Sequence, residues 1–255
     1  MPYPQDLFSD SFRLRVAAGL VPGVRELLKF GRNPDVDIAT EEDIWTYGGT
    51  KTYLDAAETI SVVSDSAEDA TGLTGTYEII LFGLDNNFDE ITEVITPNGL
   101  TPVVTTQSFR RLFRMVATKA GSAKSNVGNI TATASTSLTV QAYINAGNSQ
   151  TEMTHYTVPA GHTAFMTISV SSVEYGKSAD LYFDVRDNAY SDDATFRRLV
   201  TVIVSGGVTD VQIPIPEPLT EKIDLRIRAS CYTNQSSISS WYQLYVIDNK
   251  FLNNL

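Results

Sequence analysis

The stretch Ile223-Asp-Leu-Arg-Ile-Arg-Ala229 decides the fold class of this chain. Apolar and charged residues alternate in it, so an extended backbone turns the apolar side chains to one face and the charged ones to the other. The stretch Asp180–Arg186 has the same alternation, with Leu181, Phe183 and Val185 on its apolar side. A period of two predicts half-buried β-strands that have one face packed and the other face in water.

Short strands of this kind are expected throughout residues 51–255, with turn chemistry between them. Turns are indicated at Asp85-Asn86-Asn87, Pro97-Asn98-Gly99 and Gly206-Gly207. No long helical crossover separates the strands, which excludes a parallel α/β fold. The pattern predicts an all-β chain of antiparallel β-sandwiches, at least one of them jelly-roll-like.

The chain divides into three zones. Residues 1–50 are expected to form an N-terminal arm that is poorly patterned. Residues 51–148 are expected to form a first β-sandwich domain, and residues 149–255 a second, jelly-roll-like β-sandwich domain.

One short helix is predicted in the arm, over Val21–Phe30. Val24, Leu27 and Leu28 have helical spacing there, and Gly31 would end the helix. A helix of this length is not stable alone in water, so it must dock on its own sheet or on a neighbouring subunit.

The charge of the chain argues against nucleic acid as a partner. The formal net charge is −11 and the pI is about 4.6, so the chain gains nothing from releasing counterions at phosphates. One basic cluster is interpreted as an outward strand face balanced by carboxylates: Arg110, Arg111, Arg114, Lys119 and Lys124. No window approaches the roughly 18 apolar residues of a membrane span, so no membrane partner is expected.

The usual catalytic motifs are missing from the sequence. Two histidines and one cysteine cannot build a closed zinc site without help from carboxylates. Cys231 is predicted to be a buried free thiol, because a nucleophile would need His155 or His162 beside it and nothing in the sequence brings them close. The chain is therefore predicted not to be an enzyme and to hold no cofactor.

Two acidic clusters leave calcium binding open as an alternative. Asp85 and Asp89 lie in one predicted loop, and Asp35 and Asp37 lie in the arm. Oxygen ligands at close spacing suit calcium, although neither cluster matches the EF-hand pattern. Solvated turns explain both clusters with fewer assumptions, so no metal site is predicted.

Aromatic residues near the C-terminus offer a possible sugar platform. Trp241 and Tyr245 share one face of a predicted strand, whereas Tyr242 takes the other face. A tryptophan that faces the core is the commoner arrangement, and we interpret Trp241 in that way.

Several segments resemble, in the same order, those of a family of virion structural proteins from tailed bacteriophages of marine and freshwater bacteria. The segments are Phe30–Asp37, Glu41–Trp45, Ala57–Ser61, Gly83–Ile91, Val127–Thr131 and Tyr156–Thr163. They cover about half of the chain. The resemblance implies a non-enzymatic particle component, either a capsid decoration (cement) protein, a head-fibre base, or a neck or tail protein.

Such a component is expected to bind other virion proteins through its arm and sheet edges. A homo-oligomer, either a trimer or a larger ring, fits this role, and so does a location in the virion after assembly in the host cytoplasm. The residues predicted as partner-interface anchors are Phe30, Arg32, Asn33 and Trp45. Alternatively, Asn33-Pro34-Asp35 is a turn that ties the arm to its own sandwich. The alternative function is a receptor- or carbohydrate-binding β module of a phage fibre.

Overall fold

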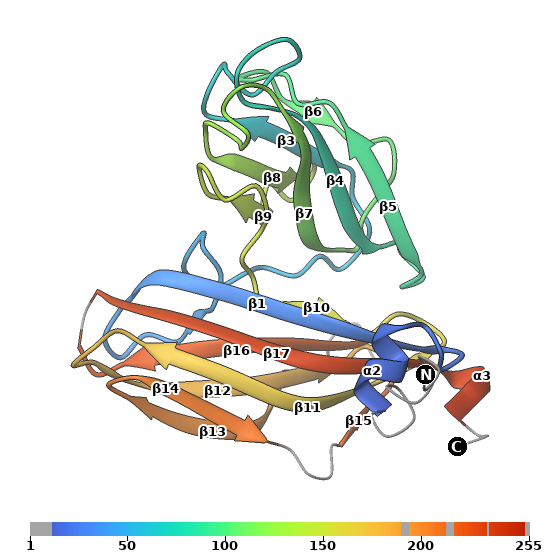
Figure 1. Ribbon diagram of the computed structural model, residues 1–255, viewed down its shortest axis with the longest axis vertical. Coiled ribbons are helices and arrows are strands. Elements are labelled where there is room, and N and C mark those ends of the chain that lie inside the picture. Colours follow the sequence, from blue (N-terminus) through green and yellow to red (C-terminus); the bar gives the residue numbers. More distant parts are fainter. Residues whose placement is uncertain (1–11, 190–193, 213–216, 234, 253–255) are drawn as a thin grey trace, which may run out of the picture.

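The computed structural model describes residues 12–189, 194–212, 217–233 and 235–252. It consists almost entirely of antiparallel strands, with a short helix near the N-terminus. The predicted all-β fold class is confirmed. The strands form two sandwiches, one above the other in Figure 1. We call the lower one the large sandwich and the upper one the small sandwich.

The large sandwich contains two five-stranded sheets. Sheet A has the order β1 (Val24–Val36), β17 (Ser236–Asp248), β11 (His162–Val173) and β14 (Val208–Gln212), with β15 (Pro218–Leu219) also paired to β11. Sheet B has the order β10 (Tyr156–Thr157), β16 (Ile223–Cys231), β12 (Ser178–Asp187) and β13 (Arg197–Ser205), with β2 (Glu42–Asp43) also paired to β16.

The small sandwich contains a four-stranded and a three-stranded sheet. Sheet C has the order β6 (Val103–Val104), β3 (Ile60–Ser64), β8 (Ile130–Ala134) and β9 (Val140–Ile144). Sheet D has the order β5 (Glu90–Ile95), β4 (Thr76–Leu84) and β7 (Arg111–Ala120).

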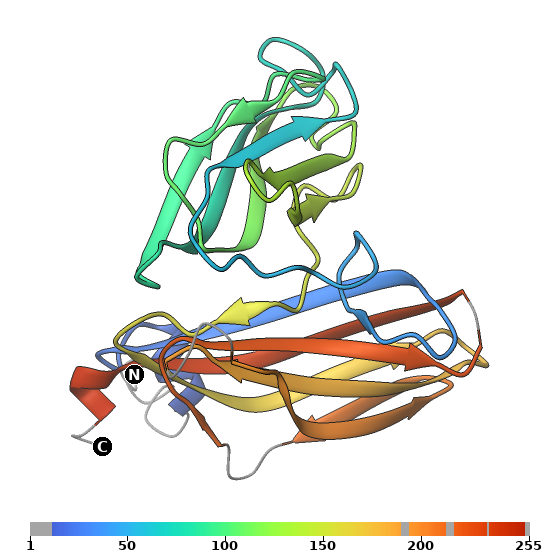
Figure 2. The ribbon, with the colours of Figure 1, turned by 180° about the vertical axis from the view of Figure 1, so that it is seen from behind.

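The small sandwich is an insertion into the large one, between β2 and β10. The chain leaves the large sandwich at Trp45 and returns at Met153, and these two residues form an isolated antiparallel bridge. Figure 2 shows the outgoing and returning connections side by side between the sandwiches. Residues 24–44, which the sequence predicts to belong to an arm, are thus part of the same sandwich as the C-terminal strands.

The helix predicted over Val21–Phe30 is wrong, because this segment forms most of β1. The strand pairs with β17 from Val24 opposite Ile247 to Asn33 opposite Ile238. A short apolar run fits both a helix and a strand, and the pairing with β17 decides between them. The short N-terminal helix is α2 (Phe12–Ala17), which lies earlier in the chain.

Each sandwich has its own core. Tyr242, Leu244 and Phe183 belong to the core between sheets A and B, whereas Ile60 and Met115 belong to the core of the small sandwich. A third cluster lies on the outer face of sheet A, near α2 and α3 (Asn249–Leu252), and comprises Val16, Val24, Tyr245 and Ile247. Phe113 of the small sandwich packs against the core of the large one, so some apolar contact crosses the junction.

The interpretation of Trp241 as a core residue is wrong. Tyr242 is 0% exposed and faces the core, whereas Trp241 is 36% exposed on the outer face of sheet A. The alternation of the two faces was predicted correctly. Because both faces carry aromatic residues, the pattern could not indicate which face points to the core.

Gly31, in the segment Phe30–Asp37, lies where β1 closely approaches the backbone at Ile44 and Thr154. A Cβ atom on this residue would lie 2.3 Å from the Ile44 carbonyl oxygen and 2.8 Å from the Thr154 nitrogen. Glycine therefore allows β1 to pass directly over the backbone that leads into and out of the small sandwich.

Candidate functional site

The charged face of sheet B is buried at the junction of the two sandwiches. Asp224 is 0%, Asp184 is 2% and Arg226 is 8% exposed, so the prediction that this face lies in water is wrong. Strand β2 pairs with β16, and the connection from β2 leads across this face into the small sandwich. Alternation indicates which face of a strand is polar, but it does not reveal whether another part of the chain covers that face.

Asp224 is the centre of a buried charge network. Its Oδ1 accepts hydrogen bonds from Arg111 Nε at 2.8 Å and from Thr157 Oγ1 at 2.6 Å. Its Oδ2 accepts from Arg111 Nη2 at 3.0 Å, from Arg186 Nη2 at 2.6 Å and Nε at 2.9 Å, and from Asn188 Nδ2 at 2.9 Å. Because Arg111 lies on β7 and the other donors belong to the large sandwich, this Asp224 network ties the two sandwiches together.

The protein environment keeps Asp224 ionised. Burial by itself raises the pKa of this carboxyl, but the charge and hydrogen bonds of Arg111, followed by those of Arg186, lower it below its usual value. A carboxylate offers about four acceptor positions, and six donor atoms share those of Asp224. Its acceptor positions are thus filled from within the chain.

Arginines of the junction also lie over aromatic rings. The Tyr53 and Phe196 rings contact each other, and the Arg186 guanidinium lies against both, at 4.5 Å and 4.7 Å from their centroids. Arg226 lies 3.8 Å from the Phe196 centroid. Planar guanidinium groups suit such a site, because they can stack and donate hydrogen bonds at the same time.

A second buried carboxylate, Asp43, lies beside His155. The distance from His155 Nε2 to Asp43 Oδ2 is 3.0 Å, a close electrostatic contact whose angles fall outside those of a hydrogen bond. Burial lowers the pKa of His155, so the imidazole is neutral at pH 7. A carboxylate beside an imidazole can orient a general base, but His155 is 2% exposed and neither ring nitrogen has a hydrogen-bond partner among the described residues.

Lys51 is another charged link at the junction. Its backbone N–H donates to Asp43 Oδ2 at 2.7 Å, and its Nζ donates to the Leu112 and Gln141 carbonyl oxygens. Burial lowers the pKa of Lys51 to about 7.

Cys231, as predicted, is a buried free thiol, and burial raises its pKa above the usual value. Lys51 and Cys231 are both buried.

An open cavity lies at the other end of the junction, between β1 and sheet D. It has a volume of about 350 Å³, and Arg25 and Tyr156 from the large sandwich line it together with Glu90, Phe113 and Arg114 from the small one. The Arg25 and Glu90 side chains form an ion pair at the mouth of this interdomain cleft. The Tyr156 and Phe113 rings meet edge to face, with centroids 5.4 Å apart.

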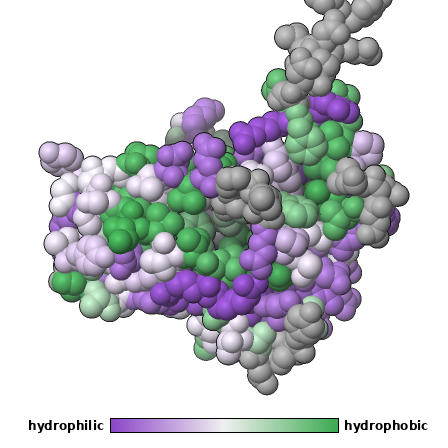
Figure 3. Space-filling view, turned by 90° about the horizontal axis from the view of Figure 1, so that it is seen from below, coloured by the Kyte–Doolittle hydropathy of each residue, from purple (hydrophilic) through white to green (hydrophobic). Residues whose placement is uncertain are grey.

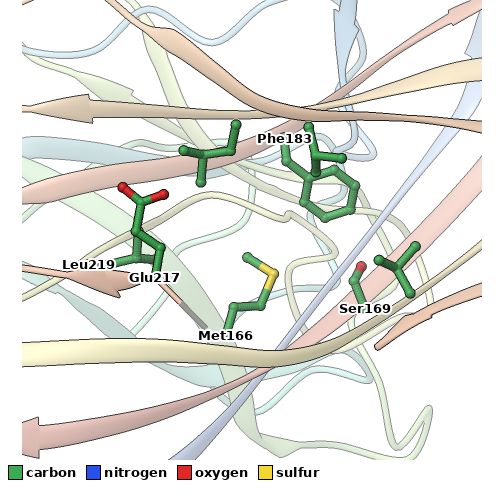
Figure 4. Close-up of a pocket in the computed structure, with 8 residues that line it drawn as sticks. Met166, Ser169, Phe183, Glu217 and Leu219 are labelled. Atoms are coloured by element: carbon green, nitrogen blue, oxygen red, sulfur yellow. The ribbon is translucent and has the colours of Figure 1, made fainter. Parts of the chain in front are cut away.

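A second cavity, of about 290 Å³, opens between sheets A and B of the large sandwich. Its lining includes Met166, Phe183 and Leu219, as well as Ser169 and Glu217 (Figure 4). Apolar residues also gather on the face of the large sandwich that points away from the small one (Figure 3). The Glu217 carboxylate is already paired with Arg197 at 3.0 Å. The other lining residues are mostly apolar, so this second cavity offers mainly apolar contacts.

The predicted interface anchors divide into two groups. Trp45 is 2% exposed within the core of the small sandwich, and Asn33 is 1% exposed. Asn33 Nδ2 donates to Glu42 Oε2 at 3.0 Å, and its Oδ1 accepts the Asp35 N–H, which is the turn that the alternative described. Only Phe30, which is half-buried, and Arg32, which is exposed, can meet another chain directly.

The structure also shows the surroundings of Arg111, from the basic cluster, and of Asp85, from one of the acidic clusters. Arg111 of the basic cluster is 3% exposed inside the Asp224 network, not on an outward face, and nothing in its local sequence signals this. Asp85 Oδ1 accepts the backbone N–H groups of Asn87 and Asp89, as in a turn.

In the described part of the chain, no group of three histidine, cysteine or acidic residues is arranged to hold a metal ion. None of the described helices is long and apolar enough to span a membrane.

Comparison with known proteins gives little. No protein-family model and no curated protein matches the chain. Among solved structures, the infectious bursal disease virus Gx strain is 11% identical over 88% of this chain and 76% of that chain, with a TM-score of 0.22. The VP2 subviral particle of the same virus is 10% identical over 90% and 73%, with a TM-score of 0.20. These are weak similarities to viral capsid proteins.

Proposed function

We propose that this chain is a non-enzymatic structural component of a tailed-phage particle, as a capsid decoration (cement) protein, a head-fibre base, or a neck or tail protein. The observation that carries the proposal is the Asp224 network. It joins two β-sandwiches through a buried carboxylate whose acceptor positions are all used. A joint of this kind favours a fixed relative orientation of the two bodies over chemistry, and the segments that resemble phage virion proteins point the same way.

Other virion proteins would be the partners, and the free edge of sheet B is a suitable contact surface. Strand β13 is the outer strand of this sheet, and Val200 and Ile203 on it are 40% and 65% exposed. An exposed apolar edge strand readily adds a strand or side-chain contacts from another chain. Repetition of one such contact in a trimer or larger ring would place the chain in the virion, after assembly in the host cytoplasm, without nucleic acid or membrane as a partner.

The first test measures incorporation into particles. Particles assembled in a host that supplies the Ile203→Lys variant should lose the protein, as measured by quantitative mass spectrometry of purified virions. The fold should survive, because substitutions at exposed positions usually change the free energy of unfolding by less than about 0.5 kcal/mol. Tyr175→Lys, at a position that is 93% exposed, is the matched control and should incorporate normally. Absence of the unmodified protein from mature virions would overturn the proposal.

The second test concerns the N-terminal segment. A deletion of residues 1–45 would remove β1 and β2 and unfold the large sandwich, so it cannot report on assembly. A deletion of residues 1–11 leaves every described strand intact. Loss of incorporation in this variant supports a clamp by the N-terminal segment, whereas full incorporation limits the partner contacts to the sheet edges.

A carbohydrate-binding module of a phage fibre is the second candidate. It is favoured by Trp241, which is more exposed than its sequence context predicted. A glycan array that finds a specific sugar whose binding is lost in Trp241→Ala would favour this candidate over the first.

A further inference from the structure

The interdomain cleft has the size and position of a small-molecule site. Its volume of about 350 Å³ is near the lower end of the range of roughly 300–1,000 Å³ for ligand pockets, so it suits a single ring. The two sandwiches contribute opposite walls, and Arg25 and Tyr156 face Glu90, Phe113 and Arg114. Clefts between domains are frequent ligand sites.

The hydroxyl group of Tyr156 is buried in this cleft beside Arg25. The residue is 2% exposed, and its hydroxyl is not within hydrogen-bond geometry of any described residue, although the Arg25 guanidinium is close enough to lower its pKa against the effect of burial. Burial raises the pKa of Tyr156, so the hydroxyl stays protonated and can donate. A buried polar group without a partner is unfavourable, and a ligand oxygen at this end of the cleft would relieve that cost.

The charges of the lining select for a ligand with one negative charge. Arg25 and Arg114 contribute two positive charges and Glu90 contributes one negative charge, which leaves one net positive charge. Glu90 is paired with Arg25.

Arg114 donates to Gln150 Oε1 at 3.3 Å and lies 5.9 Å from the centroid of the Phe82 ring, and no ion pair with a carboxylate is found for it among the described residues. Besides burial, the positive charge of Arg114 lowers the pKa of the nearby Lys29. The Arg114 guanidinium can therefore receive a carboxylate in bidentate geometry.

The remaining lining is apolar and aromatic. Phe82 and Phe113 are half-buried, and both line the cleft beside Arg114. We propose that the interdomain cleft binds one acidic sugar residue, with its carboxylate on Arg114, a hydroxyl on Tyr156 and its apolar ring face on Phe113. A doubly charged phosphate would leave excess negative charge beside Glu90, and a neutral sugar would leave Arg114 without its partner.

Isothermal titration calorimetry on the whole purified chain tests this inference, with D-glucuronate and N-acetylneuraminate as probes. D-glucose and inorganic phosphate are the controls for neutral rings and for anions in general. We expect an acidic sugar to bind and both controls to bind at least tenfold more weakly. Loss of one hydrogen bond in Tyr156→Phe should weaken binding about fivefold, and Arg114→Gln should weaken it about tenfold or more.

Arg197→Gln on β13 is the matched control for the loss of a charge, and it should bind like the unmodified chain. Because Arg114 is exposed, Arg114→Gln keeps the test valid even if Tyr156→Phe fails to fold. The inference is overturned if neither acidic sugar binds at millimolar concentration, or if glucose or phosphate binds as tightly. It is also overturned if binding is unchanged in both cleft variants. These measurements need only the isolated chain, so they hold whether or not it is part of a particle.

Discussion

The Asp224 network and the interdomain cleft lie at the same junction, but their charged side chains are buried in the network and partly exposed in the cleft. In the network, the side chains of Arg111 and Asp224 are 4% and 0% exposed and every acceptor position of the carboxylate is used. In the cleft, the side chains of Arg25 and Glu90 are 46% and 41% exposed, and the Tyr156 hydroxyl is within hydrogen-bond geometry of none of the described residues. Saturated buried charges fix the geometry of the junction, whereas partly open ones leave room for recognition.

The largest effect should come from Asp224→Ala. This change leaves Arg111 and Arg186 charged and buried without their shared partner, and such a loss costs about 3–5 kcal/mol in the free energy of unfolding. Urea denaturation followed by circular dichroism measures it, with Glu217→Ala as a control at an ion pair whose side chains are 57% and 55% exposed. Equal effects of the two substitutions would show that the network does not hold the junction.

A smaller loss is expected from Thr157→Val, which keeps the side-chain shape but removes one donor to Asp224. The Thr157 hydrogen bond is 2.6 Å long and ends on an ionised acceptor, so its loss should cost about 1.5–2 kcal/mol. The double variant Thr157→Val with Asp224→Ala should be no less stable than Asp224→Ala alone. An additive double variant would contradict the assigned contact.

The pH dependence of the free energy of unfolding tests the burial of Lys29 and Lys51. Burial lowers the pKa of Lys29 and of Lys51 to about 7, against roughly 10.4 in an unfolded chain. The unfolded state therefore binds more protons between these values, and the free energy of unfolding should rise with pH by about 1 kcal/mol per lysine from pH 7 to 8.

Urea denaturation at both pH values measures this rise, and Lys29→Met should remove the share of one lysine. Lys250→Met, at a side chain that is 84% exposed, should leave the rise unchanged. A free energy of unfolding that falls over this interval would refute the assigned burial of the two ammonium groups.

The smallest effect is expected from Arg25→Gln at the mouth of the cleft. Exposed ion pairs contribute less than about 1 kcal/mol, so thermal and urea denaturation should barely change. The contrast with Asp224→Ala tests the comparison directly. If Arg25→Gln destabilised the chain as much as Asp224→Ala, the cleft would be a structural joint too.

The candidate site was only partly predictable from the sequence. Asn33 was correctly given a turn as its alternative, because asparagine before proline has a local hydrogen-bonding preference. Arg111 was assigned to an outward face, because a strand pattern states only that its neighbours alternate. Its partner Asp224 is 113 positions away, and no local pattern connects the two.

The sequence by itself determined that the chain is all-β and where most strands and turns lie, because alternation and turn chemistry act over a few neighbouring residues. The tertiary structure alone decided that Val24–Val36 is a strand, that the small sandwich is inserted between β2 and β10, and that the charged face of sheet B is buried. These outcomes depend on which distant segments pair and cover one another. A buried ion pair is stable only once both partners have been brought together out of water.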